Sequence, residues 1–324
     1  MIMSVLLFAV GLVLLIKGGD WFVDGATGIA KRFNLPDIVV GATVVSIGTT
    51  LPEVMVSTTG ALAGSGAMAY GNAIGSIICN TALIAAISIT CNPGPVNVKS
   101  MKTPAIFFFG AAAMYCLAAY GLGTFPRWMG FVMLTVFVVY MVLTVRNGMK
   151  NPDSVEEEEE EDSKPKALWQ ELLLLVIGAA VIAVGADLLV EHGQIIAIGL
   201  GVPETVVALL FVALGTSLPE LVTTITSLKK GRASLGVGNV IGANVFNLVL
   251  VSGVAVSLAP FDVPCENLLL DTGLNLSLVF DIPVMLGVMS LMIFPAMATT
   301  KLGRWQGIAL LCIYAAFCVC QFVL

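Results

Sequence analysis

The sequence predicts an all-α integral membrane protein whose ten transmembrane helices form two inverted five-helix repeats. Three observations lead to this prediction: an apolar composition, ten long apolar segments and an internal duplication. Hydrophobic residues make up 58% of the 324 residues and charged residues only 11%, whereas a soluble protein carries about 25% charged residues. A soluble surface cannot be covered by so few charges, so the chain must contact lipid.

Five apolar segments precede a charged stretch and five follow it. The first segment lacks a basic leader region and a small-residue cleavage site, so we interpret it as a helix and not as a signal peptide. In order, the ten expected spans cover residues 1–16, 38–63, 69–90, 104–119, 128–145, 168–190, 203–228, 235–258, 275–298 and 305–324. The first repeat, the acidic linker and the second repeat are then residues 1–148, 149–167 and 168–324.

A shift of 167 residues aligns the two halves without a gap. Between residues 41–80 and 208–247, 13 of 40 aligned positions are identical, more than unrelated apolar sequences share. Because five helices is an odd number, the second repeat must enter the membrane from the opposite side. Inverted repeats of this kind are typical of secondary transporters, whose substrate site lies between the repeats near the membrane midplane.

Basic residues predict the orientation of the chain. Fourteen of the 15 Lys and Arg residues lie on the connections of one face, and only Arg127 lies on the other. By the positive-inside rule, both termini are outside the cell and the linker is cytoplasmic. The linker contains seven consecutive acids, residues 156–162, which account for the net charge of −6 and are typical of a solvated tether.

Several classes of protein are excluded by missing motifs. One histidine cannot supply an HExxH zinc site, and the chain contains no GxxxxGK[ST] phosphate loop and no GxSxG nucleophile motif. Its seven cysteines include no CxxC pair and lie mostly in apolar segments, which is typical of buried side chains and not of disulfides. We expect neither an enzyme nor a cofactor, and we expect no nucleic-acid partner and no obligate protein partner.

The best-matched segments of the two halves place an acid at mid-membrane. They read Gly-Thr-Thr-Leu-Pro-Glu at residues 48–53 and Gly-Thr-Ser-Leu-Pro-Glu at residues 215–220. An acid at the centre of a membrane helix costs about 2.5–3.5 kcal/mol, so such a residue usually serves a function. Pro52 and Pro219 each leave a carbonyl one turn earlier without its helical partner, and free carbonyls at this depth line a cavity or bind a ligand.

Each half therefore offers a carboxylate, hydroxyls and free carbonyls, all of which are hard oxygen ligands. The hydroxyl residues one turn before Glu53 and Glu220 are Thr49, Thr50, Thr216 and Ser217. Oxygen ligands suit Ca²⁺, which takes six to eight of them, and also Na⁺-like ions. A site between two acids can be filled by one divalent ion, several monovalent ions or protons, which is the physical basis of antiport. The alternative interpretation is a pair of structural glutamates hydrogen-bonded to neighbouring hydroxyls.

The next helix of each half adds glycines and polar side chains. Gly71 and Gly75, like Gly238 and Gly242, are spaced for close helix packing. Polar residues at helical spacing form a stripe on each helix: Asn72, Ser76 and Asn80 in the first half, and Asn239 and Asn247 in the second. Such a stripe can complete an ion site or form hydrogen bonds between helices.

The paired motifs resemble the alpha repeats of the cation/calcium exchanger superfamily, in particular its prokaryotic sodium/calcium exchangers. The resemblance covers the whole chain in topology and is most specific in residues 41–80 and 208–247. It implies alternating access, Ca²⁺ and Na⁺ as transported partners within the lipid bilayer, and a prokaryotic plasma membrane. The residues that match the family's ligands are Glu53, Thr49, Thr50, Ser76, Asn80, Glu220, Thr216, Ser217 and Asn247 through side chains, and Ser46 and Ala213 through backbone carbonyls.

Two positions depart from the family's pattern. Ala243 stands where the family carries a serine hydroxyl at a sodium site, and Asn247 stands where several relatives carry an aspartate. Neither change affects the two glutamates. The departures therefore bear on the coupling to Na⁺ and not on the binding of Ca²⁺.

We expect an antiporter that exchanges Ca²⁺ for Na⁺. A Ca²⁺/H⁺ exchanger, in which the glutamates carry protons, is the alternative within the same class. A cation channel would also use mid-membrane acids, but channels usually build their filters from several subunits, whereas this chain completes a two-fold site by itself. Matched acids also occur at Asp20 and Asp24 and at Asp187 and Glu191, which we expect at paired or solvated ends of the first and sixth helices.

Overall fold

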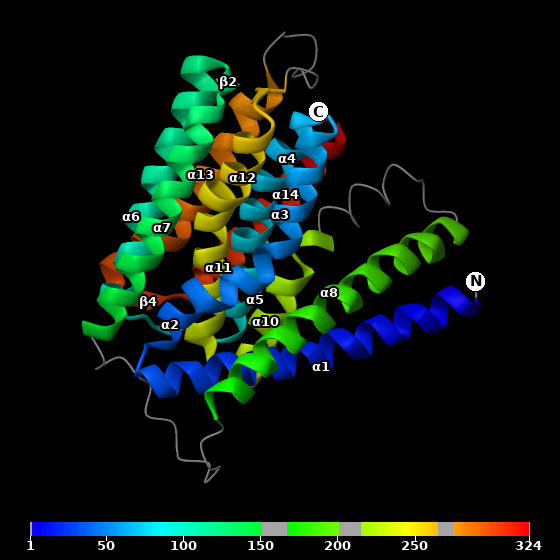
Figure 1. Ribbon diagram of the computed structural model, residues 1–324, viewed down its shortest axis with the longest axis vertical. Helices are drawn as coiled ribbons and strands as arrows, with labels where there is room; N and C mark the ends of the chain where they lie inside the picture. The colour runs from blue at the N-terminus through cyan, green and yellow to red at the C-terminus, as the bar shows by residue number, and fades with distance from the viewer. Residues whose placement is uncertain (1, 151–166, 201–214, 265–274, 324) are drawn as a thin grey trace.

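The computed structural model describes residues 2–150, 167–200, 215–264 and 275–323, and these residues are almost entirely helical (Figure 1). The first half comprises α1 (Ile2–Phe33), α2 (Asp37–Val40), η1 (Gly41–Val45), α3 (Ser46–Leu62), α4 (Gly66–Cys79), η2 (Asn80–Ala85), α5 (Ala86–Cys91), α6 (Val98–Cys116), η3 (Leu117–Leu122) and α7 (Arg127–Lys150). The second half comprises α8 (Leu168–Gly199), α10 (Leu218–Lys229), α11 (Ala233–Phe246), η5 (Asn247–Val251), α12 (Ser252–Leu258), η7 (Ser277–Asp281), α13 (Ile282–Thr299) and α14 (Arg304–Val323). The η segments are short π-helical turns within longer helices.

The expected membrane spans are confirmed where the structure describes them. Within the described ranges, nine helical segments are long and apolar enough to cross a membrane. They correspond one by one to nine of the ten expected spans. The remaining span, expected at 203–228, lies partly outside the described residues, and its described part includes α10.

Helix α1 is longer than its apolar run suggested. It extends over 32 residues to Phe33, whereas the apolar segment ends near residue 16. Packing against α8 stabilises the continuation. The two backbones lie close together there, since a Cβ added at Gly25 would lie 2.7 Å from the Glu171 carbonyl oxygen. The charged residues that end the apolar run therefore lie within a helix.

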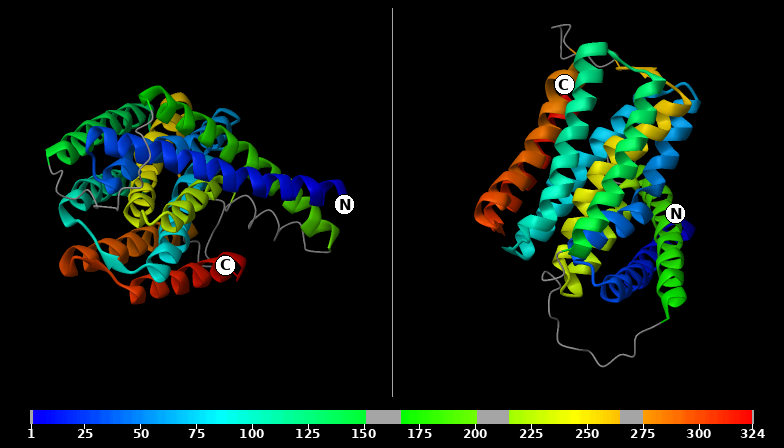
Figure 2. Two further views of the ribbon diagram at one scale, coloured as in Figure 1. Left: turned by 90° about the horizontal axis from the view of Figure 1, so that it is seen from below. Right: turned by 60° about the vertical axis from the view of Figure 1, so that its left-hand side comes forward.

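The helices α1 and α8 pack against each other with local two-fold symmetry. A Cβ on Gly11 would lie 2.9 Å from the Gly185 carbonyl, and a Cβ on Gly18 would lie 3.1 Å from the Gly178 carbonyl. The 167-residue shift exchanges these two contacts. The two helices run antiparallel and lie side by side across the lower part of the bundle in Figure 1, and the view from below in Figure 2 shows them across its near face. The inverted repeat is therefore visible in this helix pair.

The hairpins α3–α4 and α10–α11, one in each repeat, have equivalent turns. Gly64 ends the turn after α3 with a φ of 85°, and Gly231 ends the turn after α10 with a φ of 75°. These glycines are matched by the 167-residue shift. Both occupy the left-handed region that glycine adopts without steric cost, so the duplication preserves the backbone of the turn as well as the helices around it.

The core of the bundle is centred on α11. Every residue from Leu235 to Phe246 is buried, as expected for a helix that is surrounded by others. Gly238 and Gly242 allow this packing, because a Cβ there would overlap the Ile38 carbonyl and Ala42. No described atom lies within 4 Å of a Cβ at Gly71 or Gly75. The positions that symmetry places opposite that pair fall in 201–214, outside the described residues.

Two pairs of short strands connect the ends of the bundle. β1 (Gly94–Pro95) pairs with β4 (Lys301–Leu302), and β2 (Thr124–Phe125) pairs with β3 (Phe261–Asp262), both antiparallel. Each pair joins the connection between the third and fourth helices of one repeat to that between the fourth and fifth helices of the other. The strands thus follow the same two-fold relation and hold the repeats together at both ends.

Candidate ion-binding site

Two buried carboxylates lie at the centre of the bundle, one from each repeat. Glu53 lies within α3 and Glu220 within the first turn of α10, and neither side chain is exposed to solvent. The two acids interact electrostatically. None of their four carboxylate oxygens has a hydrogen-bond partner. The two acids, one from each repeat, therefore lie close enough to affect each other.

The hydroxyls of one repeat lie beside the carboxylate of the other. The Thr49 and Thr50 side chains interact with the Glu220 carboxylate, although neither has the distance and angle of a full hydrogen bond to it. Thr50 and Ser217 are buried and their hydroxyl oxygens have no partner. Thr216 is half-buried. Residues of both repeats therefore contribute to the same buried polar region.

Asn72 and Asn239 link the repeats by a matched pair of hydrogen bonds. The Thr49 hydroxyl donates to Asn239 Oδ1 at 3.2 Å, and the Thr216 hydroxyl donates to Asn72 Oδ1 at 3.4 Å. The asparagine amides then donate to hydroxyls on the preceding helix of their own repeat, at 2.8 Å to Ser57 and 3.0 Å to Thr223. These asparagines form hydrogen bonds between helices and orient the threonines that flank the glutamates.

The last polar position of each stripe coincides with a π-helical turn. Asn80 begins η2 and Asn247 begins η5, and the two residues are matched by the 167-residue shift. Both side chains are fully buried, and neither their oxygens nor their nitrogens have partners. π-Helical turns are rare and occur frequently at functional sites. Sequence periodicity gave no signal for these turns, because one extra residue in a turn leaves the apolar pattern almost unchanged.

Ser76 and Ala243 occupy matched positions but differ in chemistry. Ser76 is buried and its hydroxyl has no partner, whereas Ala243 presents only a buried methyl group. The neighbouring Asn244 donates its amide nitrogen to Thr81 at 2.7 Å, and its buried amide oxygen has no partner. At the matched position itself, the first repeat supplies a side-chain oxygen that the second lacks.

Of the two positions predicted to supply a backbone carbonyl, the structure describes Ser46. The Ser46 hydroxyl donates to the Gly41 carbonyl at 2.8 Å and to the Asn239 carbonyl at 2.9 Å, which satisfies the first carbonyl of η1 and fastens α3 to α11. Ser252 satisfies the Asn247 carbonyl at the start of η5 in the same way, at 2.9 Å. Ala213 lies outside the described residues.

The unpartnered atoms together indicate what the site can bind. Buried polar atoms are nearly always hydrogen-bonded, because leaving one unpaired costs about 1–3 kcal/mol. Seven of the predicted ligand residues carry unpartnered buried side-chain oxygens: Thr50, Glu53, Ser76, Asn80, Ser217, Glu220 and Asn247. Within the described ranges, no three His, Cys, Asp or Glu side chains cluster as a metal site. Two carboxylates with several neutral oxygens suit a hard cation that is carried and released.

The family model of the sodium/calcium exchanger protein matches residues 3–146 and 171–323. The chain belongs to the sodium/calcium exchanger family. It is 34% identical to an uncharacterised membrane protein of Methanocaldococcus jannaschii, over 97% of this chain and 96% of the relative. It is 28% identical to the sodium/calcium exchanger MaX1 of Methanosarcina acetivorans, over 98% of both chains.

A solved structure agrees with the sequence relatives. The structure of the sodium–calcium exchanger NCX_Mj superimposes with a TM-score of 0.78 at 33% identity and covers 97% of each chain. This exchanger is therefore an integral membrane protein with the all-α fold of about ten helices that the sequence predicted. Its family is one of transporters.

A cavity of about 1110 Å³ lies next to the residues predicted to bind ions. It lies between α3 and α8 and is lined mostly by apolar side chains. Thr49 and Thr216 form part of its wall on the side of the glutamates, and Asp187 and Glu191 contribute charged groups from α8.

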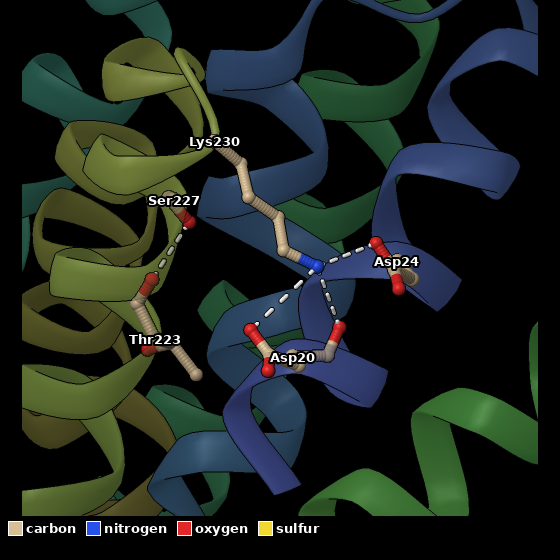
Figure 3. Close-up of polar contacts among 5 residues, drawn as sticks. All are labelled: Asp20, Asp24, Thr223, Ser227 and Lys230. Carbon is tan, nitrogen blue, oxygen red and sulfur yellow. Dashed lines mark hydrogen bonds and ion pairs between the residues drawn. The ribbon is translucent and has the colours of Figure 1, made fainter. Parts of the chain in front are cut away.

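The matched acids on α1 are paired, and their position corrects the expectation. Asp20 and Asp24 lie within α1 and not at its end, because the helix continues to Phe33. Lys230, which follows α10, lies 2.6 Å from Asp24 Oδ1 and 3.8 Å from Asp20 Oδ1 (Figure 3). The expectation of paired acids is confirmed for this pair. Asp187 and Glu191 likewise lie within α8, which continues to Gly199, and both are exposed.

Proposed function

We propose that this exchanger moves Ca²⁺ against Na⁺ by alternating access to the site between Glu53 and Glu220. The observation that carries the proposal is the pair of buried, unpartnered carboxylates, one from each repeat. Two carboxylates about 5 Å apart repel each other by about 3 kcal/mol at an effective dielectric of 20. One Ca²⁺ or a set of Na⁺ ions removes this repulsion, so the site is stable only when one kind of cargo fills it.

The proposed ligands are the oxygens that lie around these acids. We assign Glu53, Glu220, Thr49, Thr50, Thr216, Ser217, Ser76, Asn80 and Asn247 as side-chain ligands, and Ser46 and Ala213 as carbonyl ligands. The support is the burial and the missing partners of most of these side chains. Thr49 and Thr216 already have one hydrogen bond each to an asparagine, and their remaining lone pairs are available to an ion.

The counter-ion distinguishes this proposal from its nearest alternative. A Ca²⁺/H⁺ exchanger would use the glutamates as proton carriers, and its neutral oxygens would coordinate Ca²⁺ alone. Membership of the sodium/calcium exchanger family favours Na⁺. A channel is disfavoured because a single chain supplies both halves of the site.

The location of the protein follows from the same reasoning. The relatives that cover nearly the whole chain come from archaea, and we propose a prokaryotic plasma membrane. The distribution of basic residues favours external termini and a cytoplasmic acidic linker at residues 149–167. The two repeats that this linker joins are residues 1–148 and 168–324.

Uptake of ⁴⁵Ca²⁺ by proteoliposomes tests the proposed exchange. Vesicles loaded with Na⁺ and diluted into Na⁺-free medium should accumulate ⁴⁵Ca²⁺, and K⁺-loaded vesicles should not. A pH gradient imposed without Na⁺ is the control for proton coupling. Uptake driven by the pH gradient alone, with no effect of Na⁺ at any concentration, would establish the Ca²⁺/H⁺ alternative.

A further inference from the structure

The two repeats differ at one charged position. The 167-residue shift matches Asp20 with Asp187 and Asp24 with Glu191, so each repeat carries two acids on its first helix. The same shift matches Lys230 with Ala63, which ends the corresponding helix of the first repeat. Only one of the two acidic pairs therefore has a lysine opposite it.

Lys230 joins the α1–α8 pair to the helix that carries Glu220. Its ammonium group lies 2.6 Å from Asp24 Oδ1 and donates to the Asp20 backbone carbonyl at 3.1 Å (Figure 3). The Asp20 carboxylate lies 3.8 Å away. One ammonium group thus contacts two successive turns of α1. The Lys230 side chain is 29% exposed, so water screens the contact only in part.

A buried polar face of α10 leads from the central site to this lysine. Thr223, Thr224 and Ser227 follow Glu220 at helical spacing, and all are buried. The Thr223 hydroxyl donates to the Pro219 carbonyl at 2.8 Å, and the Ser227 hydroxyl donates to the Thr223 carbonyl at 2.7 Å. Lys230 follows Ser227 by three residues, so it lies at the end of this polar face (Figure 3).

The matched acids of the other repeat differ in their ion pairing and not in their exposure, since the Asp20 and Asp24 side chains are themselves 40% and 45% exposed. Asp187 and Glu191 are exposed, and among the described residues neither forms an ion pair. They line the cavity that also contains Thr49 and Thr216. The acids of the second repeat thus line a cavity beside two residues of the predicted ion site, while the equivalent acids of the first repeat are paired with a lysine.

We propose that Lys230 is a tethered cation that closes the mouth of the ion path on the linker side of the molecule. In the closed state its ammonium group is paired with Asp20 and Asp24. It releases both acids when α1 and the end of α10 separate. The freed acids then attract the transported cations, as Asp187 and Glu191 do beside the cavity that they line. Lys230 competes with the cargo at one face only, so it biases the exchanger towards the state observed here. This inference rests on the proposed Na⁺/Ca²⁺ exchange.

The test is the Ca²⁺ concentration for half-maximal exchange, measured separately at each face in right-side-out and inside-out membrane vesicles. Partly exposed ion pairs contribute little, so Lys230→Gln should raise the population open to the linker side by about two- to fivefold. The half-maximal Ca²⁺ concentration at that face should fall by the same factor, since apparent affinity scales with the competent population. Lys229→Gln is the matched control, because Lys229 is exposed and forms no ion pair within the described ranges.

Two further variants distinguish the proposed closing role of Lys230 from a general loss of stability. Asp24→Asn should have the same effect as Lys230→Gln, and the double variant should have no larger effect than either alone, because both remove one interaction. Ala63→Lys places a lysine at the matched exposed position and should raise the half-maximal Ca²⁺ concentration at the opposite face.

The outcomes distinguish this proposal from the function on which it rests. A wild-type protein without Na⁺-dependent Ca²⁺ exchange would overturn both. If wild-type exchange is normal and Lys230→Gln is indistinguishable from Lys229→Gln at both faces, only the proposed role of Lys230 is overturned. Effects of Asp24→Asn and Lys230→Gln that add fully in the double variant would also contradict it.

Discussion

The residue pair Ser76 and Ala243 is where the two halves of the ion site differ most clearly. Ser76 adds a buried hydroxyl oxygen with no partner, and the matched Ala243 adds none. A neutral oxygen contributes a larger share of the coordination of a monovalent ion than of a divalent ion held by two carboxylates. The apparent affinity for Na⁺ should therefore depend on these two positions more strongly than the affinity for Ca²⁺.

We expect Ala243→Ser to lower the Na⁺ concentration needed for half-maximal Ca²⁺ exchange. The added hydroxyl supplies the missing oxygen, and a gain of about 0.5–1.5 kcal/mol corresponds to roughly a two- to tenfold shift. Ser76→Ala is the matched variant and should shift the same concentration in the opposite direction. Both are measured as Na⁺-dependent ⁴⁵Ca²⁺ efflux from proteoliposomes. An unchanged Na⁺ dependence in Ala243→Ser would show that this position is not near a sodium site.

The helices are held at close distance by glycines whose neighbours are backbone atoms. Gly238 on α11 faces the Ile38 carbonyl, and Gly242 faces Ala42. A carbonyl of a helix cannot move aside as a side chain can, so a methyl group added at such a glycine must push two helices apart. These contacts position α11, and with it Asn239 and Asn247, against the first repeat.

We expect Gly238→Ala to destabilise the protein by about 1–3 kcal/mol, because overpacking forces a shift of the backbone. Gly287→Ala on α13 is the control, since no described atom lies within 4 Å of a Cβ there. Alanine in an open helical position should be neutral or stabilising by about 0.5–1 kcal/mol. Thermal unfolding of the purified proteins in detergent measures the difference. Equal midpoints for the two variants would contradict the close contact between α11 and α2.

In the whole molecule, the sequence predicts five helices in each repeat. Because five is an odd number, the two halves are inverted in the membrane. Fourteen of 15 basic residues on one face favour external termini and a cytoplasmic linker. A cysteine introduced at Ser154, in a background without the native cysteines, should resist membrane-impermeant reagents in intact cells and react after the membrane is opened. Labelling of this cysteine in intact cells would show that the chain has the opposite orientation.

The duplication made much of this arrangement predictable from the sequence. Identity at Thr49 and Thr216 and at Glu53 and Glu220 predicted one shared site, and the two glutamates interact electrostatically across the repeats. The repeated Gly64 and Gly231 likewise correspond to equivalent left-handed turns. Such features repeat because each depends on a local residue type at a fixed spacing.

Other features depend on three-dimensional contacts and could not be predicted. The hydrogen bonds of Asn72 and Asn239 to threonines of the opposite repeat require the packed arrangement of both halves. The length of α1 depends on its packing against α8, whereas its hydropathy alone indicated an end near residue 16. The asymmetry at Lys230 was hidden because Asp20 and Asp24 were aligned with acids and not with their partner.

The most direct test of the central claim is ⁴⁵Ca²⁺ uptake by proteoliposomes that contain Glu53→Gln or Glu220→Gln. Each variant loses one of the two charges that balance a divalent cation, so we expect Na⁺-driven uptake to fall to background while the protein remains folded and extractable. Asp281→Asn is the control, because Asp281 is an acid in another span that accepts a hydrogen bond from Gln321 at 2.7 Å, and it should retain uptake. Normal Na⁺-driven Ca²⁺ uptake in either glutamine variant would contradict the assignment of Glu53 and Glu220 as the shared ion site.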